Sequence, residues 1–428
     1  MADIVFAFDP AIDRPIPRLE AAPPAVVETL ARAPHAALES AAAIARQSEA
    51  AALVLFGRVL DPQRASPAQA AHLRMLVTGL AAHGCHTVLF AADEAARADT
   101  IRLLGGPPGL EFVTPLSPLR LDIRGIPVEM LSAQGPHESA TAAAAAALPS
   151  VALPPTGTAG HLPAPHERRI VVGWDTAHWT GERWDDEPAR GSHLASHAAT
   201  RSPHGFVVWG SRRRGPGVAG THQLPALQAR SAHEAAAGGC GALTLLDHPP
   251  VDEGLPSTAR RDALESRTDW RNAWRELPTH HVAWRTINVA SATGGDEDLA
   301  TAIWSAIEAL ALDPQGPLEI IRCHVECGTS VQRRVRIAEI SAETLARVRQ
   351  LYDARTFRAW CHEVLADPGE SLVALGHTRS GAKPGSTTSF STALADIVNR
   401  AEQEPLHAIP AELAREAGWA ALELIEST

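Results

Sequence analysis

The sequence predicts an α/β protein whose sheet is largely parallel at its start, and two observations support this prediction. Over the first ~250 residues, short apolar runs alternate with longer Ala-rich stretches of helical periodicity, which is typical of strand–helix–strand units. Several of these apolar runs then end in loops rich in charged residues, where open α/β sheets place their chemistry. The length of 428 residues, at ~150 residues per domain, suggests roughly three domains.

The elements of this first region follow one another in a clear order. A long helix is predicted over residues 24–50, with an interruption near Pro34. A second helix begins at Ser66-Pro67, an N-cap and first-turn pair, and ends near Ala82. The remaining apolar runs predict a hairpin around Gly125 (119–131) and strands at 4–8, 52–56, 86–91, 110–113, 170–173, 206–209 and 242–246.

Changes in composition divide the chain into three predicted parts. Residues 1–250 form the first domain, with a Pro- and Ala-rich loop or insertion at 133–168. A polar linker at 249–261 leads to a compact β-α-β module at 262–341, with strands at 282–289 and 318–325 around a helix at 297–311. Residues 342–428 are predicted to be helical, with amphipathic helices at 344–365 and 393–403.

Charge and composition exclude several classes of protein. The net charge of −11 argues against a protein that grips nucleic acid through an overall basic surface. The sequence has no uninterrupted apolar stretch of about 18 residues and no basic N-terminal region, so we expect neither a membrane span nor a signal peptide. Five cysteines, an odd number in a long chain, predict reduced thiols and a cytoplasmic protein.

Charged and polar residues gather in the loops that follow the predicted strands. They are Asp9 and Asp13, Arg58 and Asp61, Asp93 and Glu94, and Ser211 with Arg213. This series resembles the calcineurin-like metallophosphoesterases, whose corresponding loops run DxH, GDxxD, GNHD and GHxH. Residues 9–15, 225–240 and 278–285 further resemble DLHLDSP, PGNxQGRH…ETGPKGC and PTDVVRW of the SbcD/YhaO-type DNA-repair exonucleases.

The resemblance spans roughly residues 1–340 and implies a fold. We expect a metallophosphoesterase-like layered α/β/β/α sandwich, followed by a small β-α-β capping domain and C-terminal helices. In that family the C-terminal region docks on the coiled coil of an SMC-like ATPase of the SbcC/YhaN type. The resemblance therefore implies such an ATPase as partner and DNA reached through the complex, with a homodimer left open.

The metal ligands of the family do not carry over. Family members bind two Mn²⁺ ions and cleave phosphodiesters with a metal-bound water. Only Asp9 survives, since Ala11 stands at the first histidine, Arg58 at the bridging aspartate, and Ser211 and Arg213 at the last two histidines. No asparagine occurs before Asn272. We therefore expect no catalytic residue, no metal and no cofactor, and predict a pseudoenzyme.

The charged residues that remain in these loops have more than one possible role. Arginines paired with the loop carboxylates could replace the metal charge, or they could be ordinary loop-end ion pairs of little energetic worth. Arg212, Arg213 and Arg214 could also bind phosphate or DNA without cleaving it.

Other clusters have simpler explanations. His193 and His197 have the i, i+4 spacing of zinc ligands, but 20 histidines produce such a spacing by chance. Cys323 and Cys327 lie on one face of a predicted strand and are expected in the core.

The leading functional prediction is an inactive structural or regulatory subunit that works with the ATPase. One alternative is an active metal-dependent phosphodiesterase or exonuclease with non-standard ligands. Another is a free-standing binding module without a link to DNA.

Overall fold

The computed structural model describes part of the chain, in two compact units. The first unit comprises Met1–Arg18, Pro24–Thr180 and Trp184–Ala283, and the second Leu19–Pro23, Gly181–Arg183 and Trp284–Thr428. The described residues are 2–17, 19, 21–133, 168–174, 206–212, 221–231, 234, 238–245, 274–290, 296–310, 312–313, 315–326, 345–346, 348–349 and 359–367.

The first sheet confirms the predicted parallel start. β1 (Ile4–Phe8), β2 (Ala52–Phe56), β3 (His86–Phe90) and β4 (Leu110–Val113) are parallel neighbours in that order. Two antiparallel strands, β10 (Gly239–Leu243) and β11 (Trp274–Pro278), extend the sheet beyond β1 and give the order β11-β10-β1-β2-β3-β4. β10 begins three residues before the predicted strand at 242, because the small residues Gly239 and Gly241 pair with β11.

A second sheet of five strands belongs to the same unit. β5 (Leu119–Ile123) and β6 (Ile126–Ser132) form the predicted hairpin, whose turn places Arg124 and Gly125 at positive φ. Three parallel strands complete the order β5-β6-β7-β8-β9: β7 (Arg168–Trp174), β8 (Phe206–Gly210) and β9 (Thr221–Leu224).

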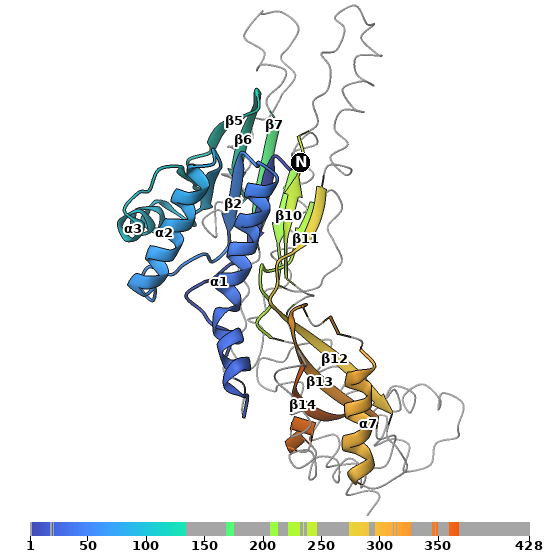
Figure 1. Ribbon diagram of the computed structural model, residues 1–428. Coiled ribbons are helices and arrows are strands. Elements are labelled where there is room, and N and C mark those ends of the chain that lie inside the picture. The colour runs from blue at the N-terminus through green and yellow to red at the C-terminus, as the bar shows by residue number, and fades with distance from the viewer. Residues whose placement is uncertain are drawn as a thin grey trace, which may run out of the picture. The chain divides into compact units, whose positions relative to one another are not determined.

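Three described helices accompany the first sheet (Figure 1). α1 (Pro24–Gln47) is continuous, so the predicted break at Pro34 is wrong. The buried Ala37, Ala41 and Ala45 pack on the core, and the free energy of this packing exceeds the cost of the backbone hydrogen bond that proline cannot donate. α2 (Pro67–Ala81) begins with the expected Ser66 cap, completed by Gln69 as a capping box. α3 (Glu94–Leu104) was not predicted.

Strand alternation sorts the first unit into layers. Val5 and Ala7 face α1 and α2, whereas Ile4, Phe6 and Phe8 face the second sheet. The described layers are therefore helix, sheet, sheet. The second helical layer of the predicted sandwich is not found among the described residues of the first unit, and residues 134–167 of the predicted insertion lie outside the described part.

The second unit contains a three-stranded sheet with one described long helix. β12 (Val282–Ala290), α7 (Asp296–Glu308) and β13 (Leu318–Glu326) match the predicted strand–helix–strand order. β14 (Ala359–Asp367) pairs in parallel with β13, so the predicted helix over 344–365 is wrong in that part. Its apolar residues Ala359, Cys361 and Val364 are buried against the strand beside them, and this pairing overrides local helical propensity.

β14 joins the same sheet as β12 and β13 across the predicted boundary at 341/342, and residues 368–428 lie outside the described part. Among the described helices, none is long and apolar enough to cross a membrane.

Candidate functional site

The carboxyl ends of strands from both sheets meet at one place. The chain leaving β1 stays paired with the chain leaving β2, since the Ala11 N–H donates to the Arg58 carbonyl at 2.8 Å. On its other side, Phe8 forms a parallel bridge with Ala226, and the Leu227 N–H donates to the Phe8 carbonyl at 2.7 Å. Loops that follow β1, β2 and β9 are thereby fixed next to one another.

Three aromatic side chains, Phe8, Phe56 and Trp174, pack together at the strand ends that carry these loops. The Phe8 ring stacks obliquely on Phe56 at 5.3 Å between centroids, and Trp174 lies 6.2 Å from Phe56. Gly57 and Gly210 make room for Phe8, because a Cβ on either would come within 2.7 Å of its ring, and Gly57 also has φ +77°. Trp174 is the last residue of β7, so the end of this strand presents an aromatic side chain to Phe56.

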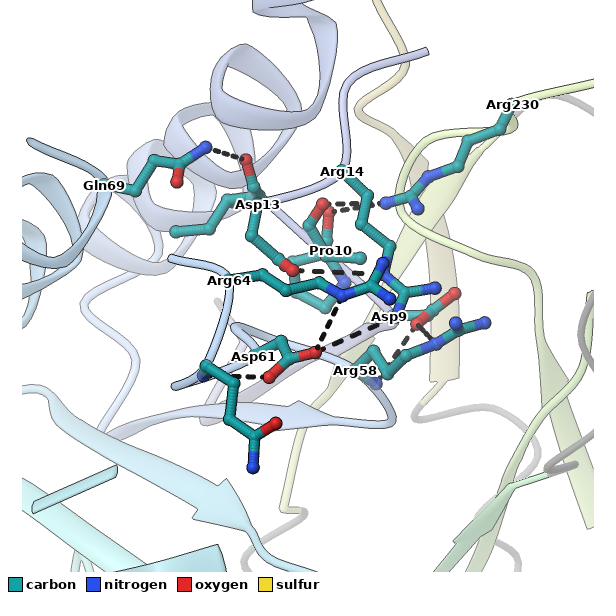
Figure 2. Close-up of polar contacts among 12 residues, drawn as sticks. Asp9, Pro10, Asp13, Arg14, Arg58, Asp61, Arg64, Gln69 and Arg230 are labelled. Atoms are coloured by element: carbon teal, nitrogen blue, oxygen red, sulfur yellow. Dashed lines mark hydrogen bonds and ion pairs between the residues drawn. The ribbon is translucent and has the colours of Figure 1, made fainter. Parts of the chain in front are cut away.

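Asp9 follows Phe8 directly and is the carboxylate around which the charged side chains of these loops gather. Its side chain is 3% exposed and its backbone is in the left-handed region at φ 52°. Oδ1 accepts the Arg58 N–H at 3.1 Å and lies 3.8 Å from Arg58 Nε (Figure 2). Oδ2 contacts Arg212 Nη2. Both carboxylate oxygens therefore face arginines from different loops.

From Arg212, a chain of polar contacts runs through Glu234 and Arg230 and back to the loop of Asp9; this chain is called the circuit below. Arg212, whose side chain is 7% exposed, has Nη1 at 3.8 Å from Glu234 Oε1. Glu234 Oε2 accepts the Arg230 N–H at 3.0 Å, and Arg230 Nη2 donates to the Ala11 carbonyl at 2.8 Å. The circuit returns to the loop of Asp9, so it ties together the segments that follow β1, β8 and β9.

A second row of ion pairs lies toward α2 (Figure 2). Arg14 lies 3.9 Å from Asp13 and 4.0 Å from Asp61, whose carboxylate is 3.7 Å from Arg64. Gln69 of the α2 capping box donates to the Ile12 carbonyl at 3.1 Å. The Asp13 side chain is 3% exposed and that of Arg64 is 69% exposed, so this row runs from the interior to the surface.

Burial sets the electrostatics of this centre. Desolvation lowers the pKa of Arg212 to about 10, with Glu234 acting in the opposite direction. Desolvation and the Arg230 charge lower the pKa of Arg58, while Asp13, Glu234 and Asp61 oppose the shift. The pKa of Arg230 is lowered mainly by burial as well. Arg212 remains protonated at neutral pH, so it is a permanent cation within contact distance of Asp9.

These residues do not fit a pair of divalent cations. Such ions need several anionic or imidazole ligands to offset their charge and lost hydration. Here the one carboxylate that matches a family ligand has both oxygens engaged by guanidinium groups. Within the described parts of the chain, no three His, Cys, Asp or Glu side chains are grouped so that they could hold a metal ion.

The structure divides the residues predicted for the site into two groups. Asp9, Asp13, Arg58 and Asp61 come together as described above. Ser211 lies beside Arg212, is buried, and donates its N–H to the Leu224 carbonyl at 3.0 Å.

Asp93 and Glu94 instead begin α3. Asp93 caps the helix by accepting the Ala96 N–H at 2.7 Å, and Glu94 accepts from Arg97 and Thr114, each at 2.9 Å. Arg97 and Thr114 lower the pKa of Glu94. These contacts explain both carboxylates as parts of a helix start.

The predicted phosphate-binding arginines are only partly described. The guanidinium group of Arg212 is buried between Asp9 and Glu234. Arg213, Arg214, His193, His197 and Cys327 lie outside the described residues.

Four charged residues of these contacts were not predicted as site residues: Arg14, Arg64, Arg230 and Glu234. Arg230 and Glu234 belong to the segment that resembles PGNxQGRH…ETGPKGC, which was the available signal. Gln228 in the same segment is buried, and its amide donates to the Val282 carbonyl at 2.7 Å and accepts the His281 N–H at 2.9 Å. The segment thus holds both the charged centre and the chain that leads into β12.

Comparisons with known proteins give a distant likeness. No family model matches the sequence, and no curated protein matches it. Among solved structures, the crystal structure of TT1561 of Thermus thermophilus is similar, with a TM-score of 0.35 and 12% identity. The match covers 65% of this chain and 100% of that one. A likeness of this extent assigns neither an activity nor a partner to the chain.

Proposed function

We propose that the chain is a non-catalytic protein of metallophosphoesterase-like fold, in which arginines take the place of the metal ions. The observation that carries the proposal is the buried Asp9 carboxylate, held between Arg58 and Arg212. A cation that reached Asp9 would have to displace Arg212 from a site with 7% exposure. It would then stand beside a second guanidinium group, and the repulsion would oppose binding.

The arrangement suits a structural role for the centre. Four loop segments converge on it, and each contributes at least one charged side chain or a carbonyl to the circuit. In metal-dependent relatives implied by the sequence resemblance, cations would join these loops. Here the guanidinium groups of Arg58 and Arg212 supply positive charge at the same strand ends. The guanidinium group of Arg230 adds a hydrogen bond to the Ala11 carbonyl.

The role that follows is a structural or regulatory subunit. The sequence resemblance suggests an SMC-like coiled-coil ATPase of the SbcC/YhaN type as partner, with DNA reached through the complex. A pull-down with the purified coiled coil of such an ATPase tests this part. Retention in a stoichiometric complex is expected, and its absence at micromolar concentrations would remove the ATPase from the proposal.

An activity assay with a matched variant tests the absence of catalysis. Purified wild-type protein and Asp9→Ala are compared on bis(p-nitrophenyl) phosphate and on single- and double-stranded oligonucleotides, each with Mn²⁺. We expect equal background rates for the two proteins. Hydrolysis by the wild type that Asp9→Ala abolishes would instead establish the alternative, an active phosphodiesterase with non-standard ligands.

A further inference from the structure

Two thiols that are far apart in the sequence meet in the core of the second unit. Cys323 of β13 and Cys361 of β14 are 38 residues apart, and their Sγ atoms are 3.7 Å from each other. Cys323 is 0% exposed and Cys361 is 4% exposed. Both belong to the hydrophobic cluster that includes Ile321, Val325 and Val364.

The strand register brings the two side chains together. β13 and β14 are parallel, with Ile321 opposite Cys361 and Cys323 opposite Val364. An irregularity after Ile321 moves the register past His362, so that both cysteines face the same core. A disulfide has an S–S length of about 2.05 Å, so the sulfur atoms need to approach by about 1.7 Å.

The surroundings of the two thiols shift their pKa values in opposite directions. The hydrogen bond between the two thiols lowers the pKa of Cys361, against the effect of burial, and the charge of Arg349 lowers it further. Arg349 is anchored there, because its Nε and Nη2 donate to the carbonyls of Cys361 and His362 at 3.2 and 3.0 Å. Hydrogen bonding to Cys361 and burial raise the pKa of Cys323. Because Arg349 is held at the backbone of Cys361, its positive charge favours the thiolate on Cys361, so Cys361 is assigned as the nucleophile and Cys323 as the resolving thiol.

We propose that Cys323 and Cys361 form a reversible intrachain disulfide between β13 and β14 when the protein meets a hydroperoxide. The Cys361 thiolate attacks one peroxide oxygen, the O–O bond breaks, and a sulfenic acid and hydroxide form. Cys323 then attacks the sulfenic sulfur, giving the S–S bond and releasing water. In sum, two thiols lose two electrons and two protons, and hydrogen peroxide becomes two waters. A dithiol reductant reverses the bond by exchange.

Two other buried thiols provide internal controls. Burial raises the pKa of Cys85 to about 11 and that of Cys240 to about 12. Both lie in the first unit, and their thiolate fractions at neutral pH are therefore very small. They should survive the oxidant concentrations that convert the Cys323–Cys361 pair.

Mass spectrometry of the full-length protein tests the proposal. The protein is treated with hydrogen peroxide, free thiols are alkylated, and peptides are mapped without reduction. The expected result is one cross-linked pair, Cys323 with Cys361, that is about 2 Da lighter than the two thiols and lost after dithiothreitol. Cys85 and Cys240 should be recovered as alkylated thiols, and the melting temperature should rise only in the oxidised sample.

Variants distinguish this pair from other linkages. Cys327→Ser should still form the cross-link, whereas Cys323→Ala should leave Cys361 as a sulfenic acid that dimedone traps. A bond from either cysteine to Cys327 would overturn the proposal, as would recovery of both as free thiols while Cys85 or Cys240 is oxidised. These measurements do not depend on the proposed function, because they detect neither metal binding nor hydrolysis.

Discussion

Two clusters of carboxylates and arginines follow strand ends of the same sheet, and they differ in burial. The cluster around Asp9, after β1 and β2, is joined by Arg212, which follows β8 of the second sheet, and the side chains of Asp9 and Arg212 are 3% and 7% exposed. The cluster after β3 lies on α3, where Arg97 pairs with Glu94 at 46% and 45% exposure and Arg102 with Asp99 at 78% and 45%. The residue types are the same in both.

The difference decides what each cluster can contribute to stability. Exposed pairs are screened by water, and typically contribute about 0–1 kcal/mol. Removing one partner of a buried pair leaves an uncompensated charge, which costs about 3–5 kcal/mol. A row of charged residues in a sequence is therefore a reliable sign of a structural centre only where the fold also buries it.

The largest expected effect is that of Arg212→Met, which keeps the apolar stem and removes the charge. The buried Asp9 and Glu234 carboxylates lose a shared partner, and we expect the free energy of unfolding to fall by about 3–5 kcal/mol. Chemical denaturation measures the change. Arg102→Ala on α3 is the control and should change it by less than about 0.5 kcal/mol. Equal, small effects of both variants would remove the distinction between the two clusters.

A double-mutant cycle sharpens this result. Asp9→Asn keeps a residue that tolerates the positive φ at this position. Combined with Arg212→Met it should cost less than the sum of the single changes, by about 1–2 kcal/mol, because the two side chains are in contact. Strict additivity in the same denaturation experiment would show that Asp9 and Arg212 are not coupled.

Asp93 should give an intermediate effect by another mechanism. Its side chain accepts the Ala96 N–H at the start of α3, so Asp93→Ala should lower the free energy of unfolding by about 1 kcal/mol. Asp93→Ser retains an N-cap acceptor and should restore most of the loss. If serine and alanine destabilise the protein equally, capping is not what Asp93 contributes.

The smallest effect is expected at a half-buried pair between α1 and α2. Desolvation first, and then the nearby His72, lower the pKa of His35 below its ordinary value of 6.5, while Glu39 opposes the shift. The ring centroids of His35 and His72 are 5.0 Å apart. Because the unfolded chain binds this proton more readily, His35 lowers stability progressively as the pH falls from about 6.5 through its folded pKa.

An NMR titration of the two histidines checks this shift directly. His35 should titrate below 6.5, and its pKa should rise when His72→Gln removes the neighbouring charge. A pKa for His35 at or above 6.5 in the wild type would contradict the packing of this pair.

Much of the fold could be predicted from local patterns. The apolar runs of β1 and β2 predict their strands because every residue of both is buried. The runs of β3 and β4, which are only partly buried, also predict their strands, and the local Ser66-Pro67 cap predicts the start of α2. Elements that depend on distant contacts were missed. β14 was predicted to be helical, since its strand character comes from its pairing with β13. β9 is only four residues long and gives no periodic signal.

The sequence predicts where the candidate site lies, at the loops after the first strands, but not which arginine of the segment after β8 contacts Asp9. The loops after β1 and β2 place Asp9 beside Arg58, and the strand pattern already implied this. The partner of Asp9 from β8 is Arg212, whereas the motif pointed to its neighbour Arg213, because the direction of a loop side chain depends on burial rather than spacing. Cys361 likewise met Cys323 only through a strand that local propensity does not predict.

The central claim is that arginine side chains occupy the place of the metal ions. A calorimetric titration of Mn²⁺ into chelator-treated protein tests it most directly. Because Arg58 and Arg212 engage both oxygens of Asp9, we expect no saturable heat up to millimolar Mn²⁺, and no change in melting temperature on adding the metal. Two-site binding at micromolar Mn²⁺, lost in Asp9→Ala, would contradict the replacement of the metal centre.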